Sequence, residues 1–458
     1  MTGRRSASPP VVDPVREAAF DVLRAVDERD SYANLILSGL LRERGLDGRD
    51  AALATELVYG TLRGRGTYDA ILAANLDRAP DELDPPVLDA LRLGSHQLLA
   101  TRIPAHAAVS TTVGLARARV GEGPGKLVNA VLRRVSEHEL DAWIELIAPA
   151  GSAAPIERLA LRHSHPPWIV RAMMDALGGD LDELARALAA DNERPAVTLV
   201  ARPGRADLAE LLQAGANPGR WSPYAAVLPE GDPADLAVVR ERRAGVQDEG
   251  SQLVALALAA VPLPAGPDQR WLDMCAGPGG KAALLAGLAT QRGARLLAVD
   301  RQPHRARLVE KVLRGDVGDH RVLVADSTEP IEGEPPFDRV LLDAPCTGLG
   351  ALRRRPEARW RRQPADLAAL RSLQVRLLRA ALDAVRPGGM VGYATCSPHL
   401  AETTTVVSDV LRARPDVDRL DARPYFPGVP DLGDGPDVQL WPHRHGTDAM
   451  YLALLRRQ

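Results

Sequence analysis

The stretch RWLDMCAGPGGKAALLA, residues 270–286, decides the fold of the second half of this chain. A short apolar run ends in an acidic residue and a cysteine, a glycine-rich loop follows, and a run of alanine and leucine comes next. This order predicts a buried strand, a tight turn and a helix whose first N–H groups face the turn. A ligand could therefore approach the backbone closely at this loop.

Four more short apolar runs follow the first one. They are RLLAVD, RVLVAD, RVLLDAPC and GMVGYATC, and patterns typical of helices separate them. Strands that alternate with helices predict a parallel sheet covered on both faces, as in Rossmann-like α/β domains. Ligands of such sheets bind outside the carboxyl ends of the strands. All five runs carry Asp or Cys at that end, so we expect a functional site there.

The first part of the chain has a different pattern. From residue 12 to about 145, amphipathic stretches with helical spacing are interrupted only by Gly and Pro, and Asp13–Pro14 is a typical helix start. We predict a multidomain protein: a disordered tail at 1–11, an all-α bundle at 12–145, a small α/β segment at 155–245 and the α/β domain at 246–458.

Composition limits the classes of protein to which the chain could belong. The net charge is −3 over 458 residues, so a basic surface for nucleic acid must be local. No apolar run approaches ~20 residues, and the N-terminus lacks the apolar region of a signal peptide. The three cysteines fit neither disulfide nor metal-ligand spacing. We therefore expect a cytoplasmic protein with free thiols, no metal and no membrane contact.

The glycine-rich loop predicts a cofactor site. An acidic residue at the end of the second strand, Asp300, could accept from ribose hydroxyls, and Asp326 after the third strand could reach an adenine edge. Pro278 and the adjacent glycine pair break the spacing of a dinucleotide loop. S-adenosylmethionine fits better, because it has no phosphate and its sulfonium favours carboxylates. The predicted loop residues are Cys275, Ala276, Gly277, Pro278, Gly279, Gly280 and Lys281.

The fourth and fifth strands should bring Asp343, Cys346 and Cys396 to one rim of the sheet. Each cysteine could be only an inert buried residue, and a disulfide is disfavoured in a reducing compartment. Two thiols beside a methyl donor instead suggest methylation of a pyrimidine carbon, in which a thiolate adds to C6 and activates C5. A positive charge, from Lys281 or the sulfonium, would stabilise the thiolate. Which cysteine attacks stays open at this point.

Several motifs resemble those of one family. DMCAGPGGK, VLLDAPCTGLGALRRRPEARW and YATCSP look like the signature motifs of bacterial RNA cytosine-5 methyltransferases of the Sun/Fmu (RsmB) type. VQDEGSQLVA and SHPPWIV resemble further motifs of that family, and GKLVNAVLRR resembles its NusB-like N-terminal domain. The resemblance therefore spans nearly the whole chain, and it implies a class I S-adenosylmethionine-dependent fold for the α/β domain.

The resemblance also implies roles for single residues. Cys396 would be the nucleophile, Cys346 would assist release of the product, and Lys281 and Asp343 would belong to the catalytic site. The glycine-rich loop, with Asp300, Asp326 and Asp343, would hold S-adenosylmethionine. Asp343 could touch the cofactor, the target base or both. The chain departs from the family pattern at His399, where an acidic residue is common, and at Ala282, where Thr or Ser is common.

The expected partner is RNA. Arginines at high density follow Cys346 and suit phosphate contacts, with a solvated helix face as the alternative. Trp360 among them could stack on a base or pack within the protein. The predicted RNA-binding residues are Arg353, Arg354, Arg355, Arg359, Arg361, Arg362 and Lys126.

The NusB-like bundle favours 16S rRNA as the substrate, and we expect a monomer. A tRNA cytosine-5 methyltransferase is the first alternative. The second is a non-catalytic RNA-binding or antitermination factor, against which the two thiol motifs and the complete cofactor loop argue.

Overall fold

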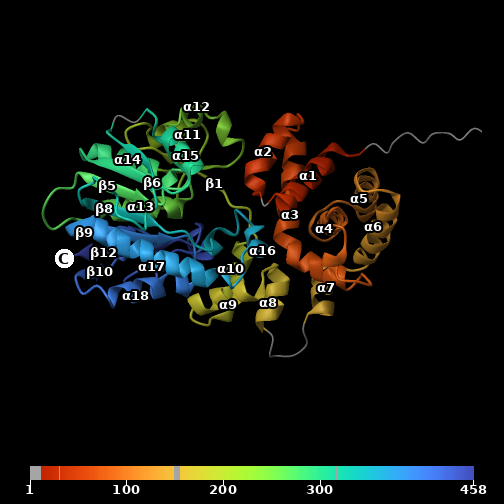
Figure 1. Ribbon diagram of the computed structural model, residues 1–458. Coiled ribbons are helices and arrows are strands. Elements are labelled where there is room, and N and C mark those ends of the chain that lie inside the picture. The colour runs from red at the N-terminus through yellow and green to blue at the C-terminus, as the bar shows by residue number, and fades with distance from the viewer. Residues whose placement is uncertain (1–11, 30, 149–154, 316–317) are drawn as a thin grey trace, which may run out of the picture. The chain divides into compact units, whose positions relative to one another are not determined.

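The computed structural model describes residues 12–29, 31–148, 155–315 and 318–458 (Figure 1). The predicted tail at 1–11 lies outside the described residues. Contacts divide the chain into two compact units, one of residues 1–171 with 352–361 and one of residues 172–351 with 362–458. This division differs from the predicted domain boundaries, which stay a prediction.

The first unit is helical, as the sequence predicted. The Asp13 carboxylate caps its first helix by accepting from the N–H groups of Val15 and Arg16, and one continuous apolar core joins the helices. None of the helices in the described ranges of the chain is long and apolar enough to cross a membrane. The helices are α1 (Pro14–Glu28), α2 (Ala33–Glu43), α3 (Gly48–Ala73), η1 (Pro80–Glu82), α4 (Pro85–Ala100), α5 (Ala105–Arg119), α6 (Glu122–Val135), α7 (Leu140–Ile147), α8 (Pro155–His163) and, inside the segment 352–361, α16 (Ala358–Arg361). In sequence, α9 (Pro167–Ala176) spans the division between the units.

The first part of the second unit contains a small sheet in the strand order β2-β3-β1-β4, with antiparallel pairing. Two of its strands were expected from AVTLVARPG and AAVLPEG. The elements of this part are α10 (Leu181–Ala190), β1 (Val197–Ala201), α11 (Leu208–Gln213), β2 (Asn217–Pro218), β3 (Ala225–Leu228), η2 (Pro233–Asp235), α12 (Ala237–Arg240) and β4 (Ala244–Val246).

The large sheet of the second unit confirms the predicted α/β fold. Five parallel strands pair in the order β9-β8-β5-β6-β7, and the loop from β5 leads into α14 as expected. Its elements are α13 (Glu249–Ala260), β5 (Arg270–Met274), α14 (Gly280–Gln291), β6 (Arg295–Asp300), α15 (Pro303–Leu313), β7 (Arg321–Val324), β8 (Phe337–Asp343), η3 (Leu349–Ala351), α17 (Asp366–Ala384) and β9 (Val385–Thr395).

An antiparallel extension of this sheet was not predicted. Strand β12 pairs antiparallel with β9, and both β10 and β11 pair with β12. The last elements of the chain are η4 (Leu400–Glu402), α18 (Thr404–Leu411), β10 (Val417–Leu420), η5 (Arg423–Tyr425), β11 (Val438–Gln439), α19 (Pro442–His445) and β12 (Tyr451–Arg457).

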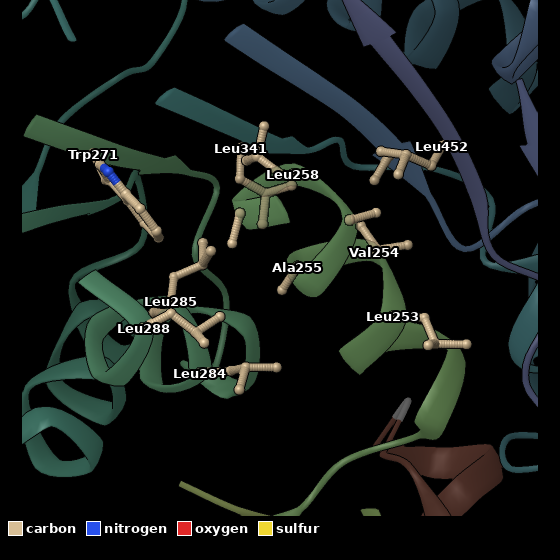
Figure 2. Packing of buried hydrophobic residues seen from close by; sticks show 14 of the residues in the cluster. Leu253, Val254, Ala255, Leu258, Trp271, Leu284, Leu285, Leu288, Leu341 and Leu452 are labelled. Carbon is tan, nitrogen blue, oxygen red and sulfur yellow. The ribbon is translucent and has the colours of Figure 1, made fainter. Parts of the chain in front are cut away.

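Successive side chains along a strand point to opposite faces of this sheet, and a separate hydrophobic core covers each face. On β8, Leu341 joins the core under α13, α14 and α15, whereas Leu342 joins the core under α17 and α18. Figure 2 shows the first core: Leu258 of α13 and Leu285 of α14 lie close to Leu341, with Trp271 of β5 beside them. A strand buried on both faces is held rigidly, and it positions whatever follows its carboxyl end.

A cavity in the second core should be costly. We expect Leu342→Ala to lower the free energy of unfolding by about 2–5 kcal/mol, because Leu342 is completely buried in the central strand β8. Urea unfolding followed by circular dichroism measures the change. The matched control is Leu308→Ala on α15, where the side chain is 41% exposed. Equal losses in the two variants would contradict the described packing.

Candidate active site

Two adjacent parallel strands bring two of the three cysteines together. Asp343, the last residue of β8, is in register with Ala394 of β9, so the loops that follow both strands leave the same edge. Cys396 comes directly after β9, and Cys346 lies in the loop after β8. The two sulfurs are 3.5 Å apart and share a hydrogen bond, with both cysteines partly buried. The predicted convergence of these thiols is thus present.

The surroundings shift the pKa values of the two thiols in opposite directions. The hydrogen bond from Cys346 lowers the pKa of Cys396, and the ammonium of Lys281 also lowers it, while burial and Asp343 oppose them. The same hydrogen bond, together with burial, raises the pKa of Cys346 well above its ordinary value. These shifts make Cys396 the more acidic of the two thiols and favour the proton on Cys346, the arrangement in which Cys346 would donate to Cys396.

Lys281 lies between the glycine-rich loop and the thiols. It is the second residue of α14, and its Nζ donates to Asp343 Oδ2 at 2.8 Å. Burial alone would lower the pKa of Lys281, but the Asp343 carboxylate raises it above the ordinary value. The side chain thus remains an ammonium and supplies a fixed positive charge near Cys396.

The loop before Lys281 adopts a backbone that favours glycine. Gly277 has φ 59° and Gly279 has φ 97°, and Cys275 adopts φ 61° although it carries a side chain. The Gly277 N–H donates to Asp300 Oδ2 at 2.9 Å, which ties this loop to the end of β6. Ala276, Pro278 and Gly280 complete the turn, and α14 begins at Gly280.

The two acidic residues expected to bind a cofactor have different environments. Asp300 is buried, and its second oxygen, Oδ1, accepts from the Gln302 N–H at 2.8 Å. Asp326 is more exposed, and its Oδ1 accepts from the N–H and hydroxyl of Thr328. Those hydrogen bonds lower the pKa of Asp326, so it remains a carboxylate at neutral pH.

The structure adds Asp273, which the sequence analysis did not single out. This residue lies on β5 and is completely buried, and no donor within the described residues reaches either carboxylate oxygen. Burial, and then the charge of Asp343, raise its pKa well above the ordinary value. A charged side chain inside the apolar run WLDM was the signal that could have revealed it.

A second residue that the sequence analysis missed is Glu402. Its carboxylate is completely buried and accepts from the N–H of Thr347, next to Cys346, and from the hydroxyl of Ser397, next to Cys396. Its signal was an acidic residue shortly after the second cysteine motif. His399, one of the two departures from the family pattern, accepts from the Ala401 N–H through Nδ1. The other departure, Ala282, is buried in α14.

The arginine-rich segment that follows belongs largely to the first unit. Arg359 is completely buried and donates to the carbonyl oxygens of Arg63 and Ser164. Arg361 donates to the carbonyls of Val26 and Ser31. These arginines satisfy backbone acceptors of the helical unit, which is a structural role that the density of charge alone did not indicate.

This burial corrects part of the RNA-binding prediction. Arg353 and Arg359 expose too little surface to contact phosphate in this structure. Trp360 packs against Gly66 of α3, so the packing interpretation of this residue is confirmed. Arg355 is exposed and lies over the ring of Tyr32, with its guanidinium carbon 4.8 Å from the ring centroid.

Besides Arg355, three predicted RNA-binding residues are accessible. Lys126 is exposed on α6 of the helical unit, and Arg354 and Arg362 are partly exposed. Contact of these residues with RNA stays a prediction.

Comparisons with known proteins agree with both units. Residues 260–456 match the family model described as 16S rRNA methyltransferase RsmB/F, and residues 13–137 match that of the NusB family. The chain is 56% identical to "Putative methyltransferase Rv1407" of Mycobacterium tuberculosis, over 97% of each chain. It is 34% identical to the ribosomal RNA small subunit methyltransferase B of Thermus thermophilus, over 96% of this chain and 97% of that one.

The fold also has a solved counterpart. The crystal structure of the protein PH0851 superposes with a TM-score of 0.80 and covers 99% of this chain and 100% of its own, at 22% sequence identity. At this identity the likeness concerns the fold alone, and the predicted architecture of a helical unit and a mixed α/β unit is confirmed.

The electrostatics of the site predict which of the three thiols reacts first. We expect iodoacetamide to alkylate Cys396 before Cys275 and Cys346 at neutral pH, because burial, followed by the nearby carboxylates, raises the pKa of Cys275, and the hydrogen bond with Cys396 and burial raise that of Cys346. Lys281→Met should raise the pKa of Cys396 and slow its alkylation. Peptide mass spectrometry across a pH series measures each rate, with Lys311→Met on the exposed face of α15 as control. An unchanged pH profile in Lys281→Met would contradict the described role of the ammonium.

Proposed function

Because this chain belongs to the RsmB/F family of 16S rRNA methyltransferases, we propose that it transfers a methyl group from S-adenosylmethionine to C5 of a cytosine in 16S rRNA. The observation that carries the proposal is the pair of sulfurs 3.5 Å apart at the carboxyl ends of β8 and β9. This pair lies on the same sheet edge as the glycine-rich loop, next to the Lys281–Asp343 ion pair.

The residues around the loop fit S-adenosylmethionine. Asp300 and Asp343 place carboxyl groups at this edge, which suits a sulfonium and disfavours the phosphates of a dinucleotide. Each Asp300 oxygen accepts one backbone N–H and retains capacity for a ribose hydroxyl. Asp326 would accept from the adenine edge, and the unpartnered carboxyl of Asp273 would meet a polar group of the cofactor. When bound, the cofactor supplies an electrophilic methyl group.

The opposite acidities of the thiols support a division of labour between them. Cys396, with its lowered pKa, would attack C6 of the cytosine as a thiolate. This addition makes C5 nucleophilic enough to take the methyl group. After a base removes the C5 proton, the Cys396–C6 bond breaks, and Cys346, which holds a proton at neutral pH, would assist release of the product. Asp343, beside the thiols, would contact the target base.

RNA recognition would use both units. A cytosine can reach Cys396 only when it is unpaired or flipped out of a helix, which rRNA loops permit. The match to the NusB family supports the helical unit as an RNA-binding part, with Lys126 on its surface. Arg354, Arg355 and Arg362 would contact phosphates. We propose a monomer that acts in the cytoplasm, where rRNA is made in bacteria.

A covalent trap tests the chemistry. With S-adenosylmethionine and a 16S rRNA fragment, Cys346→Ala should accumulate an RNA-linked band on a denaturing gel, because release is impaired after the adduct forms. Cys396→Ala should form no adduct and lose methyl transfer by at least about a thousandfold. An adduct that requires Cys346 and forms in Cys396→Ala would reverse the proposed roles.

The choice of RNA needs its own measurement. We expect wild-type protein to transfer tritiated methyl groups to deproteinised 16S rRNA and not to tRNA from the same cells. Nuclease digestion and chromatography should then identify 5-methylcytidine as the product. Transfer to tRNA alone would refute the proposed substrate, and a product other than 5-methylcytidine would refute the proposed chemistry.

A further inference from the structure

Glu402 occupies an unusual position for a carboxylate. It ends the short helix η4 and is completely buried in the second unit, beside both cysteine loops. Burial of an ionised carboxylate is costly unless hydrogen bonds compensate for the lost water. The groups that donate to Glu402 therefore decide what this carboxylate holds in place.

Four neutral donors converge on the two oxygens of Glu402. Oε1 accepts from the Thr347 N–H at 2.8 Å and from Gln374 Nε2 at 3.2 Å. Oε2 accepts from the hydroxyl of Thr347 at 2.5 Å and from that of Ser397 at 2.7 Å. A carboxylate can accept four such bonds, whereas an amide at this position would present a donor to at least one of them.

The donors belong to the two loops that carry the reactive thiols. Thr347 directly follows Cys346, and Ser397 directly follows Cys396. Gln374 of α17 adds a third anchor, because its Nε2 also donates to the carbonyl of Pro345, just before Cys346. Tyr393 of β9 donates its hydroxyl to the backbone carbonyl of Glu402. The carboxylate is thus the shared acceptor between the β8 loop, the β9 loop and the helix beneath them.

We propose that Glu402 is a positioning residue that clamps the loop of Cys346 to the loop of Cys396 and so fixes the separation of the two sulfurs. The effect of this clamp on catalysis rests on the proposed function, whereas the clamp itself can be tested on the protein without RNA or cofactor. Backbone pairing between the loops is sparse: Gly350 N–H donates to the Cys396 carbonyl at 2.9 Å. The other contacts between the loops are the sulfur pair, a 3.3 Å contact between the hydroxyls of Thr347 and Ser397, and the Glu402 carboxylate, which accepts from both of those hydroxyls.

The clamp also has an electrostatic consequence. The pKa of Cys346 is raised mainly by its hydrogen bond with Cys396 and by burial, and the negative charge of Glu402 adds to them. The carboxylate therefore acts on the Cys346 side of the pair, while the ammonium of Lys281 acts on the Cys396 side. Both charges favour the proton on Cys346 and the thiolate on Cys396.

The separation of the sulfurs can be measured without RNA or cofactor. With glutathione disulfide, both thiols would lose their hydrogens to form one S–S bond, and two molecules of glutathione would be released. The equilibrium constant of this exchange gives the effective concentration of one thiol at the other. We expect Glu402→Gln to lower this effective concentration at least about tenfold, because the amide cannot satisfy all four donors.

The matched control is Asp338→Asn. Asp338 is a buried carboxylate near the start of β8, the strand that leads into the loop of Cys346. It accepts from the N–H groups of Gln269 and Arg270 and from the side chain of Arg386. The variant Asp338→Asn should lower the melting temperature as Glu402→Gln does, but leave the equilibrium constant of disulfide exchange between Cys346 and Cys396 unchanged. Ser397→Ala keeps the carboxylate but removes a hydroxyl that donates to Glu402 and lies 3.3 Å from the Thr347 hydroxyl. It should give an intermediate fall, and it serves if Glu402→Gln does not fold.

The outcomes separate the two proposals. A wild-type effective concentration in both Glu402→Gln and Ser397→Ala, or an equal fall in Asp338→Asn, would overturn the clamp. If the fall occurs as expected in a protein that methylates no RNA, the clamp stands and the proposed function fails. In single turnover with 16S rRNA, the clamp predicts that Glu402→Gln forms the adduct and releases it slowly, with unchanged binding of S-adenosylmethionine.

Discussion

The parallel pairing of β8 and β9 is the constraint on which the site depends. Because Asp343 and Ala394 are in register, the chain leaves both strands at the same edge, and Cys346 and Cys396 meet 3.5 Å apart although 50 residues separate them in sequence. Apolar cores on both faces of the sheet hold these strands rigid. A shift of this register would separate the thiols, so the hydrophobic pattern of two strands determines the chemistry available at their ends.

Ionisable side chains are concentrated at this edge of the sheet. Asp273, which has no hydrogen-bond partner among the described residues, and Glu402 are completely buried, and the partly exposed Asp343 pairs with the largely buried Lys281. In such low-dielectric surroundings a charge strongly affects its neighbours. Their arrangement gives two chemically identical thiols different acidities. The same acidic surroundings support the proposal of a cationic cofactor. Perturbed acidities of this kind are common at functional sites, which strengthens the assignment of the site on physical grounds.

The arginine-rich segment shows how one composition can serve different purposes. The number of arginines in this short stretch predicted phosphate contacts, yet Arg359 and Arg361 donate to backbone carbonyls of the helical unit. An arginine carries five donors, so it can satisfy several backbone acceptors at once. Trp360, over Gly66, fills space that only a glycine leaves open. Local composition cannot distinguish these roles, because the acceptors come from distant parts of the chain.

The sequence by itself determined the helical and α/β architecture, the parallel strands, and the edge at which Asp300, Asp343, Cys346 and Cys396 gather. Those features can be read from short stretches of sequence, because they depend on local hydrophobic periodicity and on which residues stand at the ends of strands. The antiparallel strands β10 and β12, the burial of Arg359, and the positions of Asp273 and Glu402 were decided only by the tertiary structure. The pKa of each thiol is also decided only by the tertiary structure. It depends on which charged groups lie nearby, and only folding brings Lys281 into the surroundings of Cys396 and Glu402 into those of Cys346.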